Sequence, residues 1–236
     1  MSNQLTIGIL GGMGPRATVQ FEHMLLERLT GGDQELPTIV AINDGSIPDR
    51  SAFLVGSGSD PLPRMQRNLT MLELLDADII CIPCNTACAP AIFNRLNPAS
   101  SSIINLPEEV GRALQSSNAK RAFVLGTQGT IALGTYQNVC ASVDVSYVTP
   151  TARVQRLVTQ IIAAVKQNDM SRARDIASHV VVAIAESGCD TVILGCTELP
   201  LVKAQLVPPS CAAIDTLAVL ADACVSYTQD NAKEFI

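Results

Sequence analysis

The sequence predicts an α/β protein of two pseudosymmetric lobes, each a doubly wound parallel sheet, with the active cleft between the lobes. Short apolar runs alternate with longer amphipathic segments, which is the pattern of parallel strands joined by right-handed helical crossovers. The second observation is a repeated motif, in which an Asp, an apolar run, a Gly or Pro and a Cys follow in order. The motif ends at Cys84 and again at Cys196, 112 positions later.

A glycine-rich turn after an apolar run also occurs twice, around Gly14 and around Gly129, at an offset of 115 positions. Since both motifs recur in the same order at nearly the same offset, we infer an internal duplication rather than a short-period repeat. We expect an N-terminal lobe over residues 1–104 and a second lobe over 105–208. The C-terminal segment, 209–236, is expected to return to the first lobe.

The elements follow from local pattern. Apolar runs bounded by turn formers indicate buried strands, and apolar residues spaced by three and four indicate helices. Pro15 suits the first turn of its helix, where its missing N–H costs nothing. Residues 44–63 are rich in Gly, Ser, Pro and Asp and predict a long loop, a common place for ligand binding. The expected strands are Leu5–Leu10, Thr38–Asn43, a run from Asp78 towards Cys84, Ser102–Asn105, Ala122–Gly126, Val143–Val148, Asp190–Gly195 and Cys211–Ile214. The expected helices are Pro15–Leu29, Arg64–Leu75, Ala87–Leu96, Glu108–Ser116, Ala152–Lys166, Arg172–Glu186 and Leu217–Tyr227.

Composition argues against several classes of protein. A net charge of −6, 3% aromatic residues and the absence of Trp argue against a nucleic-acid partner, which needs basic and stacking side chains. No apolar run is long enough to cross a bilayer, so we expect no membrane span, and no basic segment precedes the first predicted strand at Leu5, so we expect no secretory leader. The eight cysteines predict reduced thiols in the cytoplasm rather than a disulfide framework. A small anionic ligand would then be held by local charges or helix N-termini.

Cys84 and Cys196 are the first candidate functional residues. Each follows the carboxyl end of a predicted buried strand, where open α/β sheets bind their ligands. A single cysteine there is more often a small packing residue, but a matched pair favours two thiols that face one site. The remaining cysteines considered are expected to be buried packing residues: Cys81, Cys140, Cys189, Cys211 and Cys224.

Metal and nucleotide sites are weaker interpretations. Cys81 and Cys84 have opposite side-chain parity, and a chain with two His offers no second pair of ligands, so we expect no metal. Gly12 and Gly14 satisfy a loose dinucleotide fingerprint, although Pro15 fits it poorly. A backbone nest for a carboxylate is the simpler interpretation. Tight turns that need glycine for conformation alone remain an open alternative.

Three charged residues have two open interpretations each. Arg50 lies in the predicted loop, where arginines are mostly solvated, but opposite a carboxylate substrate it would form a bidentate clamp. Lys166 ends a predicted helix and suits either the surface or a charge partner for the helix C-terminus. Glu198 either caps a helix or binds a substrate ammonium group.

Several stretches together resemble the cofactor-independent aspartate/glutamate racemase superfamily, most closely its aspartate racemase branch. They are Gly8–Thr18, Pro48–Arg50, Pro83–Ala87, Gly126–Thr130 and Leu194–Pro200, and they follow the family order across nearly the whole chain. The resemblance implies two pseudosymmetric lobes with an acidic amino acid bound between them, no cofactor and a homodimer. Many relatives have a His four residues after the first cysteine, where this chain has Cys88.

The resemblance also implies a two-base mechanism. Racemisation removes the Cα proton from one face and returns a proton to the other, so one thiolate acts as base and one thiol as acid. Without an electron sink, fixed donors must stabilise the carbanionic transition state. Arg50 would bind the substrate carboxylate, and Lys166 would assist. The other candidate substrate-binding residues are Gly12, Met13, Asn85, Thr86, Gly126, Thr127, Thr130, Thr197 and Glu198.

The leading hypothesis is therefore a cytoplasmic aspartate racemase. Glutamate is the alternative substrate, because a pocket one methylene longer discriminates only modestly. Two hypotheses from other classes stay open. One is a nucleotide-binding oxidoreductase built on the first glycine-rich turn, and the other is a non-catalytic protein that binds dicarboxylates.

Overall fold

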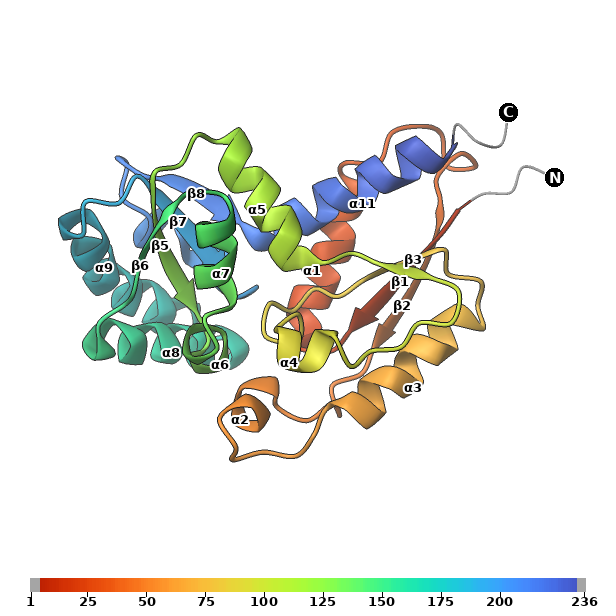
Figure 1. The fold of residues 1–236 in the computed structure, drawn as a ribbon, viewed down its shortest axis with the longest axis horizontal. Coiled ribbons are helices and arrows are strands. Elements are labelled where there is room, and N and C mark those ends of the chain that lie inside the picture. Colours follow the sequence, from red (N-terminus) through yellow and green to blue (C-terminus); the bar gives the residue numbers. More distant parts are fainter. Residues whose placement is uncertain (1–4, 233–236) are drawn as a thin grey trace.

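Two four-stranded parallel sheets form the framework of the protein (Figure 1), in a computed structural model that describes residues 5–232. The strand orders are β2-β1-β3-β4 and β6-β5-β7-β8, so the second sheet repeats the topology of the first. The strands are β1 Thr6–Gly11, β2 Thr38–Asn43, β3 Ile79–Cys81, β4 Ser102–Ile103, β5 Arg121–Gly126, β6 Ser146–Val148, β7 Thr191–Gly195 and β8 Ala212–Asp215. The predicted fold class, two doubly wound α/β lobes, is confirmed.

Helices flank both sheets. Proline lies in the first turn of several of them, and side-chain oxygens of Thr127, Thr151 and Asp169 cap α6, α8 and α9. The helices are α1 Pro15–Leu26, α2 Arg50–Leu54, α3 Leu62–Glu73, α4 Pro90–Phe93, α5 Leu106–Ser116, α6 Gln128–Ala132, α7 Thr135–Ser142, α8 Ala152–Lys166, α9 Met170–Glu186, α10 Lys203–Leu206 and α11 Thr216–Ala232, with a 3₁₀ turn at Leu199–Val202.

Some expected elements differ from the observed ones. The segment 44–63, predicted as a loop, contains the short helix α2, which is capped by Asp49. The helix was not predicted because it is brief and is surrounded by Gly and Ser residues. The predicted 87–96 helix is reduced to α4, since Ala89 precedes a proline and is held in an extended conformation. Helices α6 and α7 were not predicted at all.

Helix α11 joins the two lobes. It leaves β8, which pairs with β7 in the second sheet, and contacts both α1 and α5 (Figure 1). Leu217 and Leu220 of α11 are fully buried in the apolar core that also contains β1 and β3. Within the segment 209–236, the strand thus belongs to the second sheet and the helix lies along the first lobe. The lobe limits remain a prediction, and residues 1–4 and 233–236 lie outside the described range.

No helix within residues 5–232 is both long and apolar enough to cross a membrane.

Candidate active site

The two matched cysteines line one small cavity between the lobes. Cys196 directly follows β7, and Cys84 lies three positions after the end of β3, so both extend from carboxyl ends of central strands. Each is 5% exposed, and the cavity they share measures about 20 Å³. Its other walls are Met13, Asp49, Arg50, Ser51, Asn85, Thr86, Thr127, Lys166, Thr197 and Glu198.

Cys196 is paired with a carboxylate. Its Sγ donates to Oε2 of Glu198 at 2.9 Å, and both side chains are buried. Burial, the negative charge of Glu198 and this hydrogen bond raise the pKa of Cys196, while the charge of Lys166 acts in the opposite direction. The environment therefore favours the protonated thiol. Glu198 also accepts from the hydroxyl of Thr197 at 3.4 Å.

Cys84 has different neighbours. The position one helical turn later holds Cys88, whose N–H donates to the Cys84 carbonyl at 3.2 Å and whose Sγ donates to the Ile82 carbonyl at 3.8 Å. Burial raises the pKa of Cys88, so this second thiol stays protonated. Within residues 5–232, the backbone N–H groups of Asn85 and Thr86 have no hydrogen-bond partner, and they follow Cys84 directly.

Arg50 is a buried cation held by the backbone. Its guanidinium donates to the carbonyl oxygens of Ile47 at 3.1 Å, Pro48 at 2.9 Å and Met13 at 3.0 Å. The side chain is 8% exposed, has no carboxylate partner among the described residues, and leaves Nε buried without an acceptor. Three neutral carbonyls orient the charge but do not neutralise it, so the position suits an anionic ligand.

A cluster of three threonines joins the lobes at the site. The hydroxyl of Thr86 from the first lobe lies 2.9 Å from that of Thr127 and 3.3 Å from that of Thr130 in the second lobe. Thr127 and Thr130 are 3.0 Å apart, and Thr127 also caps α6. These hydroxyls satisfy one another, so the cluster fixes the relative position of the strand ends.

A second polar network centres on Asn85 and joins residues from distant parts of the chain. Nδ2 of Asn85 donates to the Thr216 hydroxyl at 2.9 Å, which in turn donates to the Leu194 carbonyl at 2.8 Å. The hydroxyl of Tyr136 donates to Oδ1 of Asn85. Burial and the nearby cysteines raise the pKa of Tyr136, which therefore stays protonated. The side chain of Asn85 thus acts mainly in joining the lobes.

Gly12 and Gly126 are closely packed in the two glycine-rich turns. Gly12 has a φ of +92°, and a Cβ there would lie 2.2 Å from the Asp44 carbonyl oxygen, so only glycine fits. Its N–H donates to Thr18 at 2.9 Å and is not a free donor. Gly126 lines neither cavity of the site, and its carbonyl accepts from the amide of Gln155. Gly12 lines the larger cavity of the site, and the carboxylate nest expected at the two glycine-rich turns stays a prediction.

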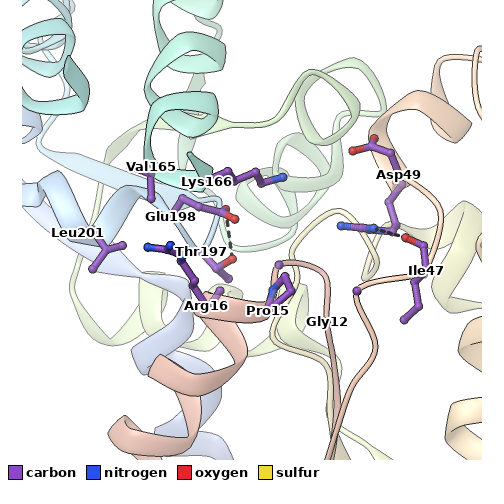
Figure 2. A pocket seen from close by; sticks show the side chains of 14 residues that line it. Gly12, Pro15, Arg16, Ile47, Asp49, Val165, Lys166, Thr197, Glu198 and Leu201 are labelled. Carbon is purple, nitrogen blue, oxygen red and sulfur yellow. Dashed lines mark hydrogen bonds between the residues drawn. The ribbon is translucent and has the colours of Figure 1, made fainter. Parts of the chain in front are cut away.

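A larger cavity of about 400 Å³ adjoins the small one and shares five wall residues with it (Asp49, Arg50, Lys166, Thr197 and Glu198). Figure 2 shows Val165, Glu198 and Leu201 on one wall, with Ile47 and Asp49 on the opposite wall. Lys166, an exposed residue at the end of α8, extends its ammonium group into the space between them (Figure 2).

Sequence reasoning missed several residues of the site. Asp49 and Ser51 flank Arg50 and could have been included on that ground alone. Arg16, on the wall of the larger cavity, belongs to the first glycine-rich stretch. Tyr136 and Thr216 carry no motif, and their sequence positions give no sign that they reach Asn85. Among residues 5–232, no three His, Cys, Asp or Glu side chains are arranged to hold a metal ion.

Comparison with known proteins identifies the family. The sequence pattern of the Asp/Glu/Hydantoin racemase family matches residues 10–224. The chain is 30% identical over 236 residues to the broad specificity amino-acid racemase RacX of Bacillus subtilis (strain 168), covering 93% of this chain and 96% of RacX. A glutamate racemase from Carnobacterium sp. (strain St2) is 27% identical over 179 residues, which are 70% of this chain and 65% of that one.

Among solved structures, an aspartate racemase from Picrophilus torridus is similar in fold and sequence. It superposes with a TM-score of 0.84 at 28% identity, over 95% of this chain and 94% of that chain. Since the family pattern spans most of the sequence and RacX is similar over nearly its full length, the chain belongs to the Asp/Glu/hydantoin racemase family.

Proposed function

We propose that the protein racemises aspartate, with Cys84 and Cys196 as the two acid–base groups. The observation that carries this proposal is the placement of two buried thiols, from matched strand ends of the two lobes, on the walls of one cavity. A substrate Cα between them would present one face to each sulfur. That is the arrangement which proton removal and return on opposite faces requires.

The two thiols take complementary roles in each direction. We assign the proton-donating role to Cys196 in the resting enzyme, because burial and Glu198 favour its thiol form. Cys84, as thiolate, removes the Cα proton from one face, and Cys196 delivers its proton to the other. The enzyme is then left with Cys84 protonated and Cys196 deprotonated, which is the state that converts the opposite enantiomer.

Fixed donors replace a cofactor in this proposal. Removal of the Cα proton sends negative charge into the α-carboxylate, where hydrogen-bond donors and cations stabilise the transition state. The free N–H groups of Asn85 and Thr86 are suitable donors, since they follow one thiol directly. Arg50 adds a buried positive charge with an unpaired Nε, and Lys166 adds an exposed one at the cavity wall.

Substrate binding must enlarge the space between the thiols. A cavity of about 20 Å³ holds roughly one water molecule, which is too little for aspartate. The adjoining cavity of about 400 Å³ shares Arg50 and Lys166 with it and provides the approach. We therefore infer that movement of the α2 segment or of Lys166 admits the substrate.

The choice of substrate rests on the relatives. Aspartate is favoured by the similarity to the Picrophilus torridus aspartate racemase over nearly the whole chain. Glutamate is the alternative, favoured by the glutamate racemase of Carnobacterium, although this chain covers 65% of that protein. A third alternative is activity on a broader range of amino acids, as the name of RacX states for that protein. We keep the cytoplasm and a homodimer as predictions, the latter to be measured by light scattering.

Proton exchange at Cα, followed by NMR in deuterated water without added cofactor, tests the proposal. L- and D-aspartate are supplied separately, and each should incorporate deuterium while it inverts. Glutamate is run in parallel as the matched substrate one methylene longer. If neither acidic amino acid exchanges or inverts, the proposed activity is wrong; if only glutamate does, the substrate assignment is wrong and the reaction class stands.

A further inference from the structure

The second lobe contains another pair of thiols, which the proposed reaction does not use. Cys189 comes just before β7 and Cys211 just before β8, and their Sγ atoms lie 3.8 Å apart. Both side chains are partly exposed, whereas the other six cysteines are buried. The expectation that Cys189 and Cys211 are buried is therefore wrong, although both pack against the apolar core of the second lobe. Their exposure follows from their position at the amino-terminal edge of the sheet, away from the site.

The backbone holds this pair at a distance that suits a covalent bond. The Ala212 N–H donates to the Asp190 carbonyl at 2.8 Å, and Thr191 pairs with Ala212. Cys211 therefore lies opposite Asp190, and Cys189 is one residue out of register. A strand spacing of about 4.8 Å and an offset of one residue, about 3.3 Å, together place the two Cα atoms roughly 5.8 Å apart, and a disulfide joins Cα atoms separated by roughly 4.4–6.8 Å. Bringing the sulfurs from 3.8 Å to bonding distance requires a shift of about 1.8 Å, which side-chain rotation and small loop movement can supply.

We propose that Cys189 and Cys211 form a reversible disulfide, a redox modification site on the second lobe. The oxidant is a low-molecular-weight disulfide. One cysteine thiolate attacks it, forming a mixed disulfide and releasing one small thiol. The second cysteine then attacks the protein sulfur of that mixed disulfide and expels the other small thiol. Two protein thiols thus lose two electrons and two protons, which reduce the small disulfide to two thiols.

Cys189 and Cys211 are more accessible to solvent than the two thiols of the proposed reaction. Cys84 and Cys196 are each 5% exposed, so a small disulfide reaches the exposed pair first. Burial, together with a hydrogen bond and charge repulsion from Cys189, raises the pKa of Cys211. Because thiolates are the attacking species, the bond should form faster as the pH rises.

The disulfide would constrain the strand that carries the site. It closes a ring over residues 189–211, which includes all of β7 and the turn with Cys196 and Glu198. Such a ring stabilises the folded state by restricting the unfolded chain. The oxidised protein should therefore unfold at a higher temperature than the reduced protein.

Peptide mapping of the full-length protein tests the proposal. The protein is equilibrated in buffers with a series of ratios of oxidised to reduced glutathione, blocked with iodoacetamide, and digested with trypsin without reduction. Cleavage at Lys203 separates Cys189 from Cys211. We expect a cross-linked peptide pair whose fragmentation assigns the bond to these two residues, together with a higher midpoint of thermal unfolding.

Variants supply the controls. Cys189→Ser and Cys211→Ser should each abolish the cross-link and the rise in the unfolding midpoint, while Ser210→Ala, beside Cys211, should retain both. Recovery of both cysteines as free thiols at the most oxidising ratio would overturn the proposal. So would stable glutathione adducts on each cysteine without ring closure, or a bond assigned to Cys196 or Cys224, which lie on the same two tryptic peptides.

Discussion

Cys84 and Cys196 occupy equivalent places in two sheets of the same topology, yet their surroundings differ. Cys196 donates to the buried carboxylate of Glu198, whereas the equivalent region of the first lobe offers free backbone N–H groups and the neutral thiol of Cys88. Duplication thus accounts for the matched strand ends that carry the two cysteines, and the local side chains favour the thiol form of Cys196. A near-symmetric backbone can carry an asymmetric charge distribution, and in the proposed reaction the two faces of the substrate would therefore meet different partners.

Removal of either sulfur is the most severe test of this comparison. Cys84→Ser and Cys196→Ser should each lower kcat/KM for aspartate racemisation by about 10²–10⁴-fold, because each removes one of two required acid–base groups. Deuterium incorporation by NMR, with each enantiomer supplied separately, measures the loss. Cys189→Ser is the matched control and should keep the wild-type rate. If one of the two site variants retains full activity, its sulfur is a packing residue.

The buried cation of the first lobe comes next in expected effect. Arg50→Lys keeps the charge but cannot reach the three carbonyls and a substrate carboxylate together. We expect a loss of about 1.5–3 kcal/mol, or roughly 10- to 150-fold in kcat/KM. Initial rates across a range of aspartate concentrations measure it. An unchanged kcat/KM would mean that Arg50 serves only to position the α2 segment.

Substitution of Glu198 and of Lys166 should shift the pKa of Cys196 in opposite directions. Glu198→Gln removes the negative charge that raises the pKa of Cys196, so the thiolate should form at lower pH than in the wild type. Lys166→Met removes a positive charge that lowers this pKa, so the thiolate should form at higher pH.

The rate of Cys196 alkylation by iodoacetamide, followed by mass spectrometry as a function of pH, measures both shifts. The two variants should move the rising limb of the profile to opposite sides of the wild type. If the alkylation rates of both variants depend on pH as in the wild type, these two charges do not control the pKa of Cys196.

The smallest effect is expected in the network that joins the lobes. Tyr136→Phe leaves Oδ1 of Asn85 buried without its donor and should cost about 1–3 kcal/mol of unfolding free energy. Thr135→Val is the matched control, because the adjacent Thr135 hydroxyl is buried and already lacks a partner. Its effect should lie within about 0.5 kcal/mol. Urea denaturation of both variants measures the difference, and equal losses would contradict a special role for the Tyr136 bond.

Much of the fold could be predicted because local pattern and final environment agree. Thr38–Asn43 and Ala152–Lys166 are observed with the predicted limits, since their apolar spacing matches the faces they bury. The short helices α2 and α6 were missed because they contact each other from the two lobes, and α7 was missed because it is stabilised by packing against α5 within the second lobe. Gly129, for instance, packs against Ser51 of α2 so closely that a Cβ would lie 3.0 Å from it.

The sequence by itself determined the pair of strand ends, their cysteines and the family pattern around them, because a buried strand and the turn after it are local features. Only the tertiary structure decided what each thiol meets. Glu198 is two positions from Cys196, but its hydrogen bond depends on how the turn packs. Tyr136 and Thr216 reach Asn85 from positions 51 and 131 residues away, and Cys211 reaches Cys189 across two paired strands. Such contacts are set by the packing of the whole chain, so no local pattern specifies them.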